Sequence, residues 1–323
     1  MNILSIYLLK ALRKVYAKVM NLPPLTDPDS VHDPDESSKI IYEELLSEKP
    51  SMIARFGAIE LLMIKNYLGI IKPGKRSITK FIMGKELPWW WERNCIRTMR
   101  TNAGFFPPTV EKIEQFCKLM IEDVTYIDVF VSWSDAICHF KKELAHCPRI
   151  NIEVINPFFA KTPWTKALEG KKVLVVHPFA RSIEQQYQKR ELLFENKDIL
   201  PVFDLKTIRA VQSIGGVSYG FSDWFEALEY MKAEIDSTDY DICLLGCGAY
   251  GFPLAAHVKR SGKKAVHVGG SLQLLFGIRG NRWENPDFNP VFNYAALMNE
   301  HWIKPGEEEK PETAGQVEGA CYW

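Results

Sequence analysis

The residues best suited to bind a ligand are glycines that follow two expected strands in the last third of the chain. Residues 240–246 and 265–268 are apolar stretches of strand length, and an amphipathic helix is expected over 252–260 between them. Five glycines stand at the strand ends and at the start of this helix: Gly246, Gly248, Gly251, Gly269 and Gly270. Glycine lets backbone N–H groups approach a phosphate, and a helix N-terminus favours negative charge. This βαβ unit therefore predicts a site for a nucleotide-type ligand beyond the carboxyl ends of its strands.

A second strand–glycine–helix junction carries an arginine and a glutamate. Residues 51–57 are typical of a strand that ends at Gly57, and residues 58–68 follow helical spacing. Arg55 lies near the end of the strand and Glu60 in the first turn of the helix, so both are expected to face the same crevice as the later glycines. A carboxylate in that turn is also stabilised by the helix dipole alone. Glu60 is therefore either a ligand-contacting group or a simple helix cap.

A third junction contributes a histidine and further basic side chains. Residues 171–177 predict a strand that ends in His177 and Pro178, and a polar, basic helix that contains Arg181 follows. Basic groups at the start of such a helix suit a pyrophosphate or sugar hydroxyls. His177 is either a general base or a hydrogen-bonded polar residue at a strand end. Arg279 and Arg282, after the last expected strand, are further candidates for phosphate contacts.

Strands and helices alternate along the chain and must position these groups. Helices are expected over 40–46 and 223–235, and a further strand over 128–133. This alternation predicts an α/β fold: a doubly wound, mostly parallel, Rossmann-like sheet with helices on both faces.

Four segments are expected from composition. They are a basic amphipathic helix over 1–21, an acidic, proline-containing linker over 22–37, the α/β domain over 38–303, and a polar, flexible tail over 304–323. The aromatic end of the tail, residues 321–323, is the one part for which folding back onto the body or onto a partner is also considered.

The N-terminal segment combines an apolar stripe with positive charge. Apolar residues recur at helical spacing over 3–19, and Lys10, Arg13, Lys14 and Lys18 add four positive charges with no acidic residue to balance them. The charges lie too deep in the segment for a spanning helix. Two interpretations stay open, a helix that lies on an anionic membrane surface and a helix packed against the body or a partner subunit.

Charge and cysteine usage limit the class of protein. The 323 residues include 40 basic and 40 acidic side chains, so bulk charge gives no reason to expect a nucleic-acid partner. Seven scattered cysteines, an odd number, indicate reduced thiols and a cytoplasmic protein. Cys138 with His139 and His146 with Cys147 lack the paired spacing of a structural zinc site, so ordinary thiols are expected there.

Two further features have both a functional and a structural interpretation. Trp89, Trp90 and Trp91 either offer a flat face to a sugar ring or pack in a core, and packing is the commoner use of such a cluster. Asp135, near the exit of the strand expected over 128–133, is either a catalytic carboxylate or the N-cap of a following helix, and capping is the stronger expectation.

Three stretches resemble the GT-D type glycosyltransferases, with a subgroup among bacterial capsule and surface-polysaccharide proteins. Residues 51–61 are similar to the opening Arg-Phe-Gly motif of that family, and residues 245–270 to its later strand–glycine–helix–strand unit. Residues 273–283 resemble the subgroup. The resemblance implies a GT-D type fold and transfer of a sugar from a nucleotide-diphosphate donor to a growing glycan or lipid-linked glycan. It also implies a cytoplasmic enzyme, at the inner face of the cell membrane if the N-terminal helix binds lipid.

The resemblance also gives the candidate residues expected roles. Glu60 would be catalytic and would hold a donor hydroxyl or a divalent metal, Mn²⁺ or Mg²⁺, although Ala58 stands where the family has Asp. His177 is the second expected catalytic residue. The donor is expected to contact Arg55, Gly57, Arg181, Gly248, Gly251, Gly269, Gly270, Arg279 and Arg282. Two alternatives stay open: a non-catalytic nucleotide-sugar-binding or assembly protein, which Ala58 favours, and a transferase that uses a non-sugar nucleotide donor.

Overall fold

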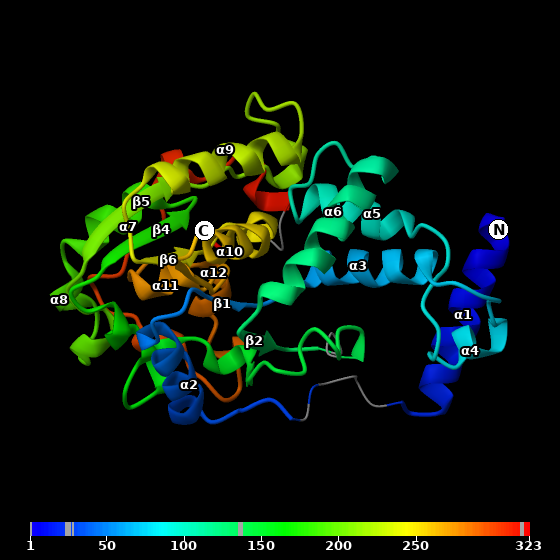
Figure 1. The fold of residues 1–323 in the computed structure, drawn as a ribbon, viewed down its shortest axis with the longest axis horizontal. Helices are drawn as coiled ribbons and strands as arrows, with labels where there is room; N and C mark the ends of the chain where they lie inside the picture. Colours follow the sequence, from blue (N-terminus) through cyan, green and yellow to red (C-terminus); the bar gives the residue numbers. More distant parts are fainter. Residues whose placement is uncertain (1, 23–26, 28, 135–137, 317–319) are drawn as a thin grey trace.

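A single sheet of seven parallel strands organises the chain (Figure 1). The computed structural model describes residues 2–22, 27, 29–134, 138–316 and 320–323. The strands lie in the order β3-β2-β1-β7-β6-β4-β5. Their bounds are β1 Ser51–Ala54, β2 Val129–Ser132, β3 Arg149–Asn151, β4 Lys172–His177, β5 Asp204–Arg209, β6 Ile242–Leu245 and β7 Lys264–His267. The predicted α/β class and parallel, doubly wound, Rossmann-like sheet are confirmed.

Each face of the sheet has its own hydrophobic core because successive strand residues point to opposite faces. In β6, Cys243 and Leu245 belong to the first core, whereas Ile242 and Leu244 belong to the second. Helices covering the first core are α3 Ala58–Ile71, α5 Arg93–Thr101, α6 Val110–Asp123, α9 Trp224–Ser237 and α10 Gly251–Arg260. Those covering the second are α2 Pro34–Leu46, α7 Ala180–Tyr187, α8 Arg190–Leu193, α11 Leu272–Leu275 and α12 Asn281–Glu284. Both faces of the central strands are therefore buried, as their continuous apolar sequences require.

The neighbouring strands β4 and β6 lead into helices on opposite faces of the sheet. The chain leaves β6 through α10, on the first core, and enters β7. It leaves β4 through α7 and α8, whose Ile183 and Leu193 belong to the second core. It then enters β5, which lies next to β4 on the side away from β6. This arrangement is a topological switch point, where open parallel sheets bind ligands beyond the carboxyl ends of their strands.

The folded domain begins earlier than residue 38. Helix α2 begins at Pro34, because Asp33 caps it by accepting a hydrogen bond from the N–H of Glu36 (2.8 Å) and proline is well tolerated in the first turn. Upstream of the cap, Val31 forms a parallel β-bridge with Ile150 beside β3. The expected linker over 22–37 is therefore wrong from Val31 onward, because its acidic, proline-bearing sequence is a helix-capping signal.

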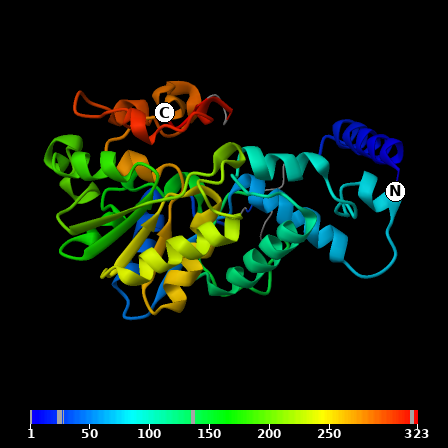
Figure 2. The same cartoon turned by 90° about the horizontal axis from the view of Figure 1, so that it is seen from above.

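The C-terminal segment is folded onto the body, so the prediction of a flexible tail is wrong for the described residues 304–316 and 320–323, and the alternative in which residues 321–323 fold back onto the body is confirmed. Glu309 is buried and accepts a hydrogen bond from the backbone N–H of Arg181 (2.9 Å), at the start of α7. Trp323 is also buried, in the second core. Figure 2 shows this orange-to-red segment along one side of the molecule. The prediction was based on polar composition. It is wrong because this acidic run contains a buried carboxylate that caps a helix.

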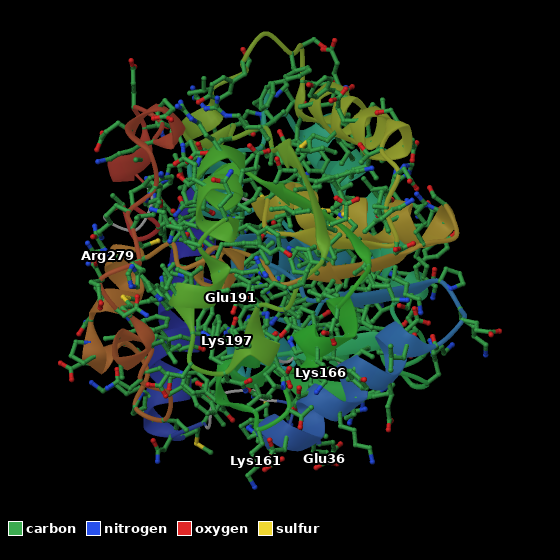
Figure 3. The ribbon with its side chains drawn as sticks, turned by 90° about the vertical axis from the view of Figure 1, so that its left-hand side faces the viewer. Glu36, Lys161, Lys166, Glu191, Lys197 and Arg279 are labelled. Atoms are coloured by element: carbon green, nitrogen blue, oxygen red, sulfur yellow. The ribbon has the colours of Figure 1, made fainter. Side chains whose placement is uncertain are left out.

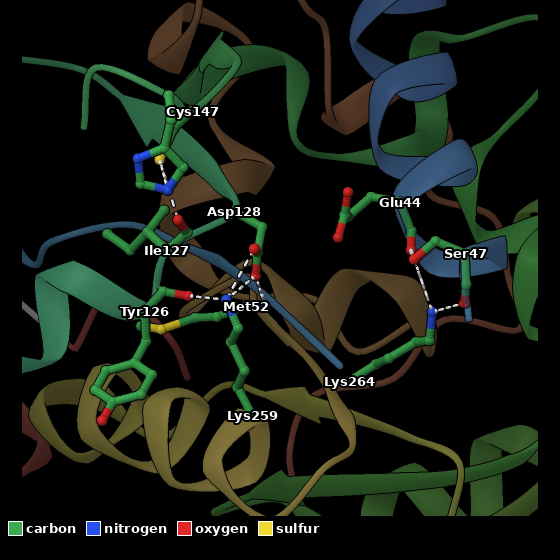
Figure 4. A network of polar contacts seen from close by, with 10 residues as sticks. Glu44, Ser47, Met52, Tyr126, Ile127, Asp128, Cys147, Lys259 and Lys264 are labelled. Carbon is green, nitrogen blue, oxygen red and sulfur yellow. Dashed lines mark hydrogen bonds and ion pairs between the residues drawn. The ribbon is translucent and has the colours of Figure 1, made fainter. Parts of the chain in front are cut away.

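A polar network joins the amino ends of β1, β2 and β7 (Figure 4). Asp128, just before β2, accepts hydrogen bonds from the backbone N–H of Met52 (2.8 Å) and from Nζ of Lys259 (2.8 Å). Nζ of Lys264, at the start of β7, donates to the backbone carbonyl of Ser47. These groups lie at the edge opposite to the carboxyl ends of the strands, so the network fixes the strands and does not form the crevice.

Candidate functional site

A cavity of about 250 Å³ lies at the carboxyl ends of four strands. Its wall includes Arg55 after β1, His177 at the end of β4, Gly246 after β6 and Gly270 after β7. The neighbouring strands β4 and β6 form the switch point of the sheet, so the cavity is where the topology predicts a ligand. The volume is slightly below the range of about 300 to 1,000 Å³ that is typical of small-molecule sites.

The side chain of Arg55 lies against the backbone that follows β7. Its Nε donates to the carbonyl of Val268 (3.3 Å) and its Nη1 to the carbonyl of Phe56 (3.3 Å). Gly269 has a φ of 81°, and a Cβ atom there would overlap Nη2 of Arg55. Burial lowers the pKa of Arg55, while Tyr322 and Glu60 oppose this shift. The two strand exits thus hold a half-buried cation at the cavity wall.

Glu60 caps α3 and lines the cavity at the same time. It is in the first turn of α3, and its carboxylate occupies the space that a Cβ atom on Gly57 would need. Burial raises the pKa of this carboxyl group, while a hydrogen bond from its own backbone N–H and the charge of Arg55 lower it. This position fits the helix-capping interpretation, and the ligand-contacting interpretation of Glu60 stays a prediction.

His177 is a neutral hydrogen-bond donor in this geometry. Its Nδ1 accepts a hydrogen bond from the backbone N–H of Phe179 (3.0 Å). Burial lowers the pKa of His177 to about 3, so the ring is neutral near pH 7 and carries its proton on Nε2. Of the two interpretations of His177, the hydrogen-bonded polar residue fits this arrangement, because Nδ1 already has a donor and Nε2 has no free lone pair.

His267 completes the wall from β7 and was missed among the candidate residues. Its Nδ1 lies 3.1 Å from the backbone carbonyl of Arg55, which must accept, so the neutral ring keeps a lone pair on Nε2. Burial, helped by the charge of Arg55, lowers the pKa of His267 to about 3. A Cβ atom on Gly251 would overlap this ring. The signal in the sequence is a histidine at the end of an otherwise apolar strand.

Two residues of the cavity wall each carry a buried polar atom that has no hydrogen-bond partner within the described residues. These atoms are the acceptor Oε1 of Gln273 and the donor Nε1–H of Trp323. Nε2 of Gln273 is already engaged with the carbonyls of Ile278 (3.2 Å) and Tyr322 (3.1 Å), which fixes the amide. Buried polar groups are nearly always paired, so an ordered water or a ligand group is expected to pair with this donor and this acceptor. A lone Gln in the apolar helix α11 is the signal that the sequence offered.

Seven of the expected site residues line this cavity: Arg55, Gly57, Glu60, His177, Gly248, Gly270 and Arg282. Gly251 and Gly269 lie directly behind the wall, against His267 and Arg55. Arg282 also places its guanidinium 5.1 Å from the ring centroid of Tyr322, which is itself a wall residue.

Arg181 and Arg279 do not line the cavity, which corrects their expected phosphate contacts. Arg181 forms an exposed ion pair with Glu308 (2.7 Å). Arg279 lies on the outer surface (Figure 3) and pairs with Glu284 (3.5 Å). In both cases an acidic residue of the C-terminal part of the chain takes the place that a phosphate was expected to fill.

Among the described residues that line the cavity, the one carboxylate side chain is that of Glu60. Among the described residues there is no group of three or more His, Cys, Asp and Glu side chains placed to hold a metal ion. Ala58 lines the cavity beside Glu60, so the position where a second carboxylate was expected offers no ligand. A divalent ion at Glu60 would depend mainly on oxygen atoms of the substrate, as Mg²⁺ often does.

The tryptophan cluster packs at the far end of the molecule. Trp89 and Trp90 contact each other and Phe81, with ring centroids 5.0 to 5.6 Å apart, and Trp91 stacks on Tyr67. None of the three tryptophans is among the residues that line the cavity. Their role is packing, as the commoner interpretation predicts. Asp135 lies outside the described residues.

Comparison with protein-family models, with curated proteins and with solved structures returned no match. The function must therefore be argued from the cavity itself.

Proposed function

We propose that the chain transfers a sugar from a nucleotide-diphosphate donor to a glycan or lipid-linked glycan acceptor. The observation that carries this proposal is the pairing of Arg55 with the glycine turn after β7, inside a cavity at the switch point of a parallel sheet. Arg55 lines this cavity, and a guanidinium is suited to the negative charge of a diphosphate. The resemblance of residues 51–61 and 245–283 to GT-D type glycosyltransferases adds to this support.

The proposed reaction breaks the bond between the anomeric carbon of the donor and a diphosphate oxygen. The acceptor hydroxyl oxygen forms the new bond to that carbon, and its proton passes to a base. The diphosphate leaves with the electron pair of the broken bond, so positive charge must meet it. In this scheme Arg55 and Arg282 face the diphosphate, and Glu60, whose pKa burial raises, takes the proton.

The neutral histidines would orient the donor and the acceptor. The Nε2–H of His177 is suited to donate to a sugar or phosphate oxygen, and the lone pair on Nε2 of His267 to accept from a hydroxyl. Gln273 Oε1 and Trp323 Nε1 add one unpaired acceptor and one unpaired donor. A cavity of about 250 Å³ would enclose the sugar and diphosphate, with the rest of the donor outside.

Thermal shift with a panel of nucleotide sugars, each with and without Mn²⁺, tests the proposal. A donor that binds the native state raises the melting temperature by mass action. We expect one nucleotide sugar to stabilise the wild type and Arg279→Ala, and to lose this effect in Arg55→Ala and Glu60→Ala. Arg279→Ala is the matched control because it removes an arginine outside the cavity. Release of the nucleoside diphosphate only in the presence of an acceptor would then establish transfer. Stabilisation by no nucleotide sugar would refute the proposal.

A non-catalytic nucleotide-sugar-binding or assembly role is the second candidate. Two observations favour it: Ala58 replaces the expected carboxylate, and His177 presents a donor where a base was considered. Stabilisation by a nucleotide sugar without any release of nucleoside diphosphate would assign this role. Stabilisation by nucleotides regardless of their sugar would instead favour a transferase with a non-sugar donor.

A further inference from the structure

Helix α1 (Ile3–Val19) packs against the body through one defined face. Leu9 is buried there against Phe81 and Trp90, which form a small core with it. Arg13 places its guanidinium 4.9 Å from the ring centroid of Phe81, and Lys10 forms an ion pair with Glu92. These contacts fix the rotation of α1 about its axis. The helix packs on α4 (Ile78–Ile82), and both lie at the end of the molecule opposite to α8 (Figure 1).

The face of α1 that this packing leaves open is apolar. Leu4, Leu8, Val15 and Val19 are separated by four, seven and four residues, so they share one side of the helix. Leu4 is 78% exposed, Leu8 60%, Val15 60% and Val19 75%. We call these four residues the outer stripe. An amphipathic helix usually buries its apolar stripe against its own protein, and α1 does so only on the side of Leu9.

Positive charge borders the outer stripe. Lys14 and Lys18 are exposed and four residues apart, so they lie on one line along the helix next to the stripe. No acidic residue lies in α1. An exposed apolar stripe with a basic border and no acidic residue matches the surface of an anionic bilayer, whose acyl region accepts the stripe while its headgroups attract the lysines.

We propose that α1 docks the protein onto an anionic lipid surface, with the outer stripe in the acyl boundary and Lys14 and Lys18 among the headgroups. This surface is independent of the cavity and does not rest on the proposed reaction. Within the described residues no helix is long and apolar enough to cross a membrane, so the contact lies along the bilayer plane.

Sedimentation with vesicles tests this proposal on the full chain. We expect the wild type to sediment with vesicles of phosphatidylcholine mixed with phosphatidylglycerol, and much less with phosphatidylcholine alone. The double variant Leu8→Glu/Val15→Glu should lose about a hundredfold or more of this partitioning, because it places two charges in the acyl boundary. The double variant Lys14→Gln/Lys18→Gln should lose about fivefold per lysine on anionic vesicles.

The matched control is Leu192→Glu/Val202→Glu, which makes the same change at two exposed residues outside α1. We expect it to sediment like the wild type. Circular dichroism and size-exclusion light scattering on each variant report folding and oligomeric state. The proposal is overturned if the wild type does not sediment with anionic vesicles or if the stripe variant sediments equally well. It is also overturned if the stripe variant converts a dimer into a monomer while no protein binds vesicles, because the stripe would then contact a second copy.

Discussion

The guanidinium of Arg55 fills the space that a Cβ atom on residue 269 would occupy, so the arginine after β1 depends on the glycine after β7. The two residues are 214 positions apart in the chain and meet because β1 and β7 are neighbours in the sheet. Gly269 therefore has two reasons to be glycine. Its φ of 81° disfavours a side chain, and its missing Cβ makes room for the cation at the cavity wall.

Replacing Gly269 with alanine should separate the effect of backbone strain on stability from the effect of the Arg55 position on ligand binding. We expect Gly269→Ala to destabilise the protein by about 1–2 kcal/mol through the left-handed backbone, and to weaken nucleotide-sugar binding about tenfold or more because Arg55 must move. Urea unfolding measures the first effect, and ligand-induced thermal shift measures the second.

Gly262→Ala is the matched control for this prediction. Gly262 has the same φ of 81°, but a Cβ atom there would meet nothing within 4 Å. We expect a similar loss of stability and no loss of binding. Equal binding by both variants would show that the position of Arg55 at the cavity does not matter.

The buried histidines predict a specific loss of stability in acid. Burial lowers the pKa of His177 and of His267 to about 3, so the unfolded chain binds protons on them near pH 6.5 while the folded protein does not. The contribution of these neutral rings to the free energy of unfolding is therefore fully present above pH 6.5. It is lost as pH falls toward 3, by about 1.4 kcal/mol per pH unit for each ring. Burial raises the pKa of Asp123 to about 6, which acts in the opposite direction.

The variant His177→Gln isolates the contribution of this ring. Asp123 and all other groups titrate alike in both proteins, so they cancel in the difference of unfolding free energy between wild type and variant. We expect the advantage of the wild type at pH 7 to shrink by about 2 kcal/mol at pH 5, as measured by urea unfolding. A difference that does not change with pH would mean that His177 is not kept neutral by burial.

Glu309 should be the anchor of the C-terminal segment. Besides the N–H of Arg181, it accepts hydrogen bonds from the N–H (3.3 Å) and the hydroxyl of Ser182. Removing this buried cap in Glu309→Ala should destabilise the protein by about 2–3 kcal/mol, because three donors lose their acceptor. The neighbouring Glu308→Ala removes only an exposed ion pair with Arg181 and should change stability by less than about 1 kcal/mol.

Urea unfolding compares the two glutamate variants, and limited proteolysis reports whether the segment detaches. Cleavage within residues 304–323 should accelerate in Glu309→Ala and not in Glu308→Ala. Similar behaviour of the two variants would mean that the segment is held elsewhere.

The unpaired indole of Trp323 gives a prediction about ligand binding. Trp323→Phe removes the Nε1–H that has no partner among the described residues, so ligand affinity should fall about fivefold or more, as for loss of one hydrogen bond. Trp302→Phe is the control, because Trp302 is equally buried but donates to the carbonyl of Leu193 (3.2 Å) away from the cavity. It should reduce stability and leave affinity unchanged. Loss of affinity in both variants would point to a general loosening of the second core.

The parts of the site that were predictable are those determined by local sequence. Arg55, Glu60 and His177 each lie where an apolar stretch gives way to a helix, and such junctions in a parallel sheet must meet at one edge. The strands and most of the helices follow from the same periodicities. The parallel sheet could therefore be inferred without knowing its strand order.

The parts that could not be predicted depend on contacts between distant residues. Arg181 and Arg279 have the sequence context of phosphate ligands. In the folded protein they form ion pairs with Glu308 and Glu284, respectively. Tyr322 and Trp323 line the cavity because contacts such as those of Glu309 and Gln273 dock a segment whose composition resembles a flexible arm. Local patterns carry no information on which charged groups meet through tertiary packing.

The docking of residues 304–316 and 320–323 has a consequence for affinity. Any conformer in which this segment leaves the body lacks the wall that Tyr322 and Trp323 provide. The apparent affinity for a cavity ligand is then the intrinsic affinity multiplied by the fraction of molecules with the segment docked. By the same linkage, an occupied cavity holds the segment in place, so amide hydrogen exchange in residues 320–323 becomes a direct reporter of occupancy.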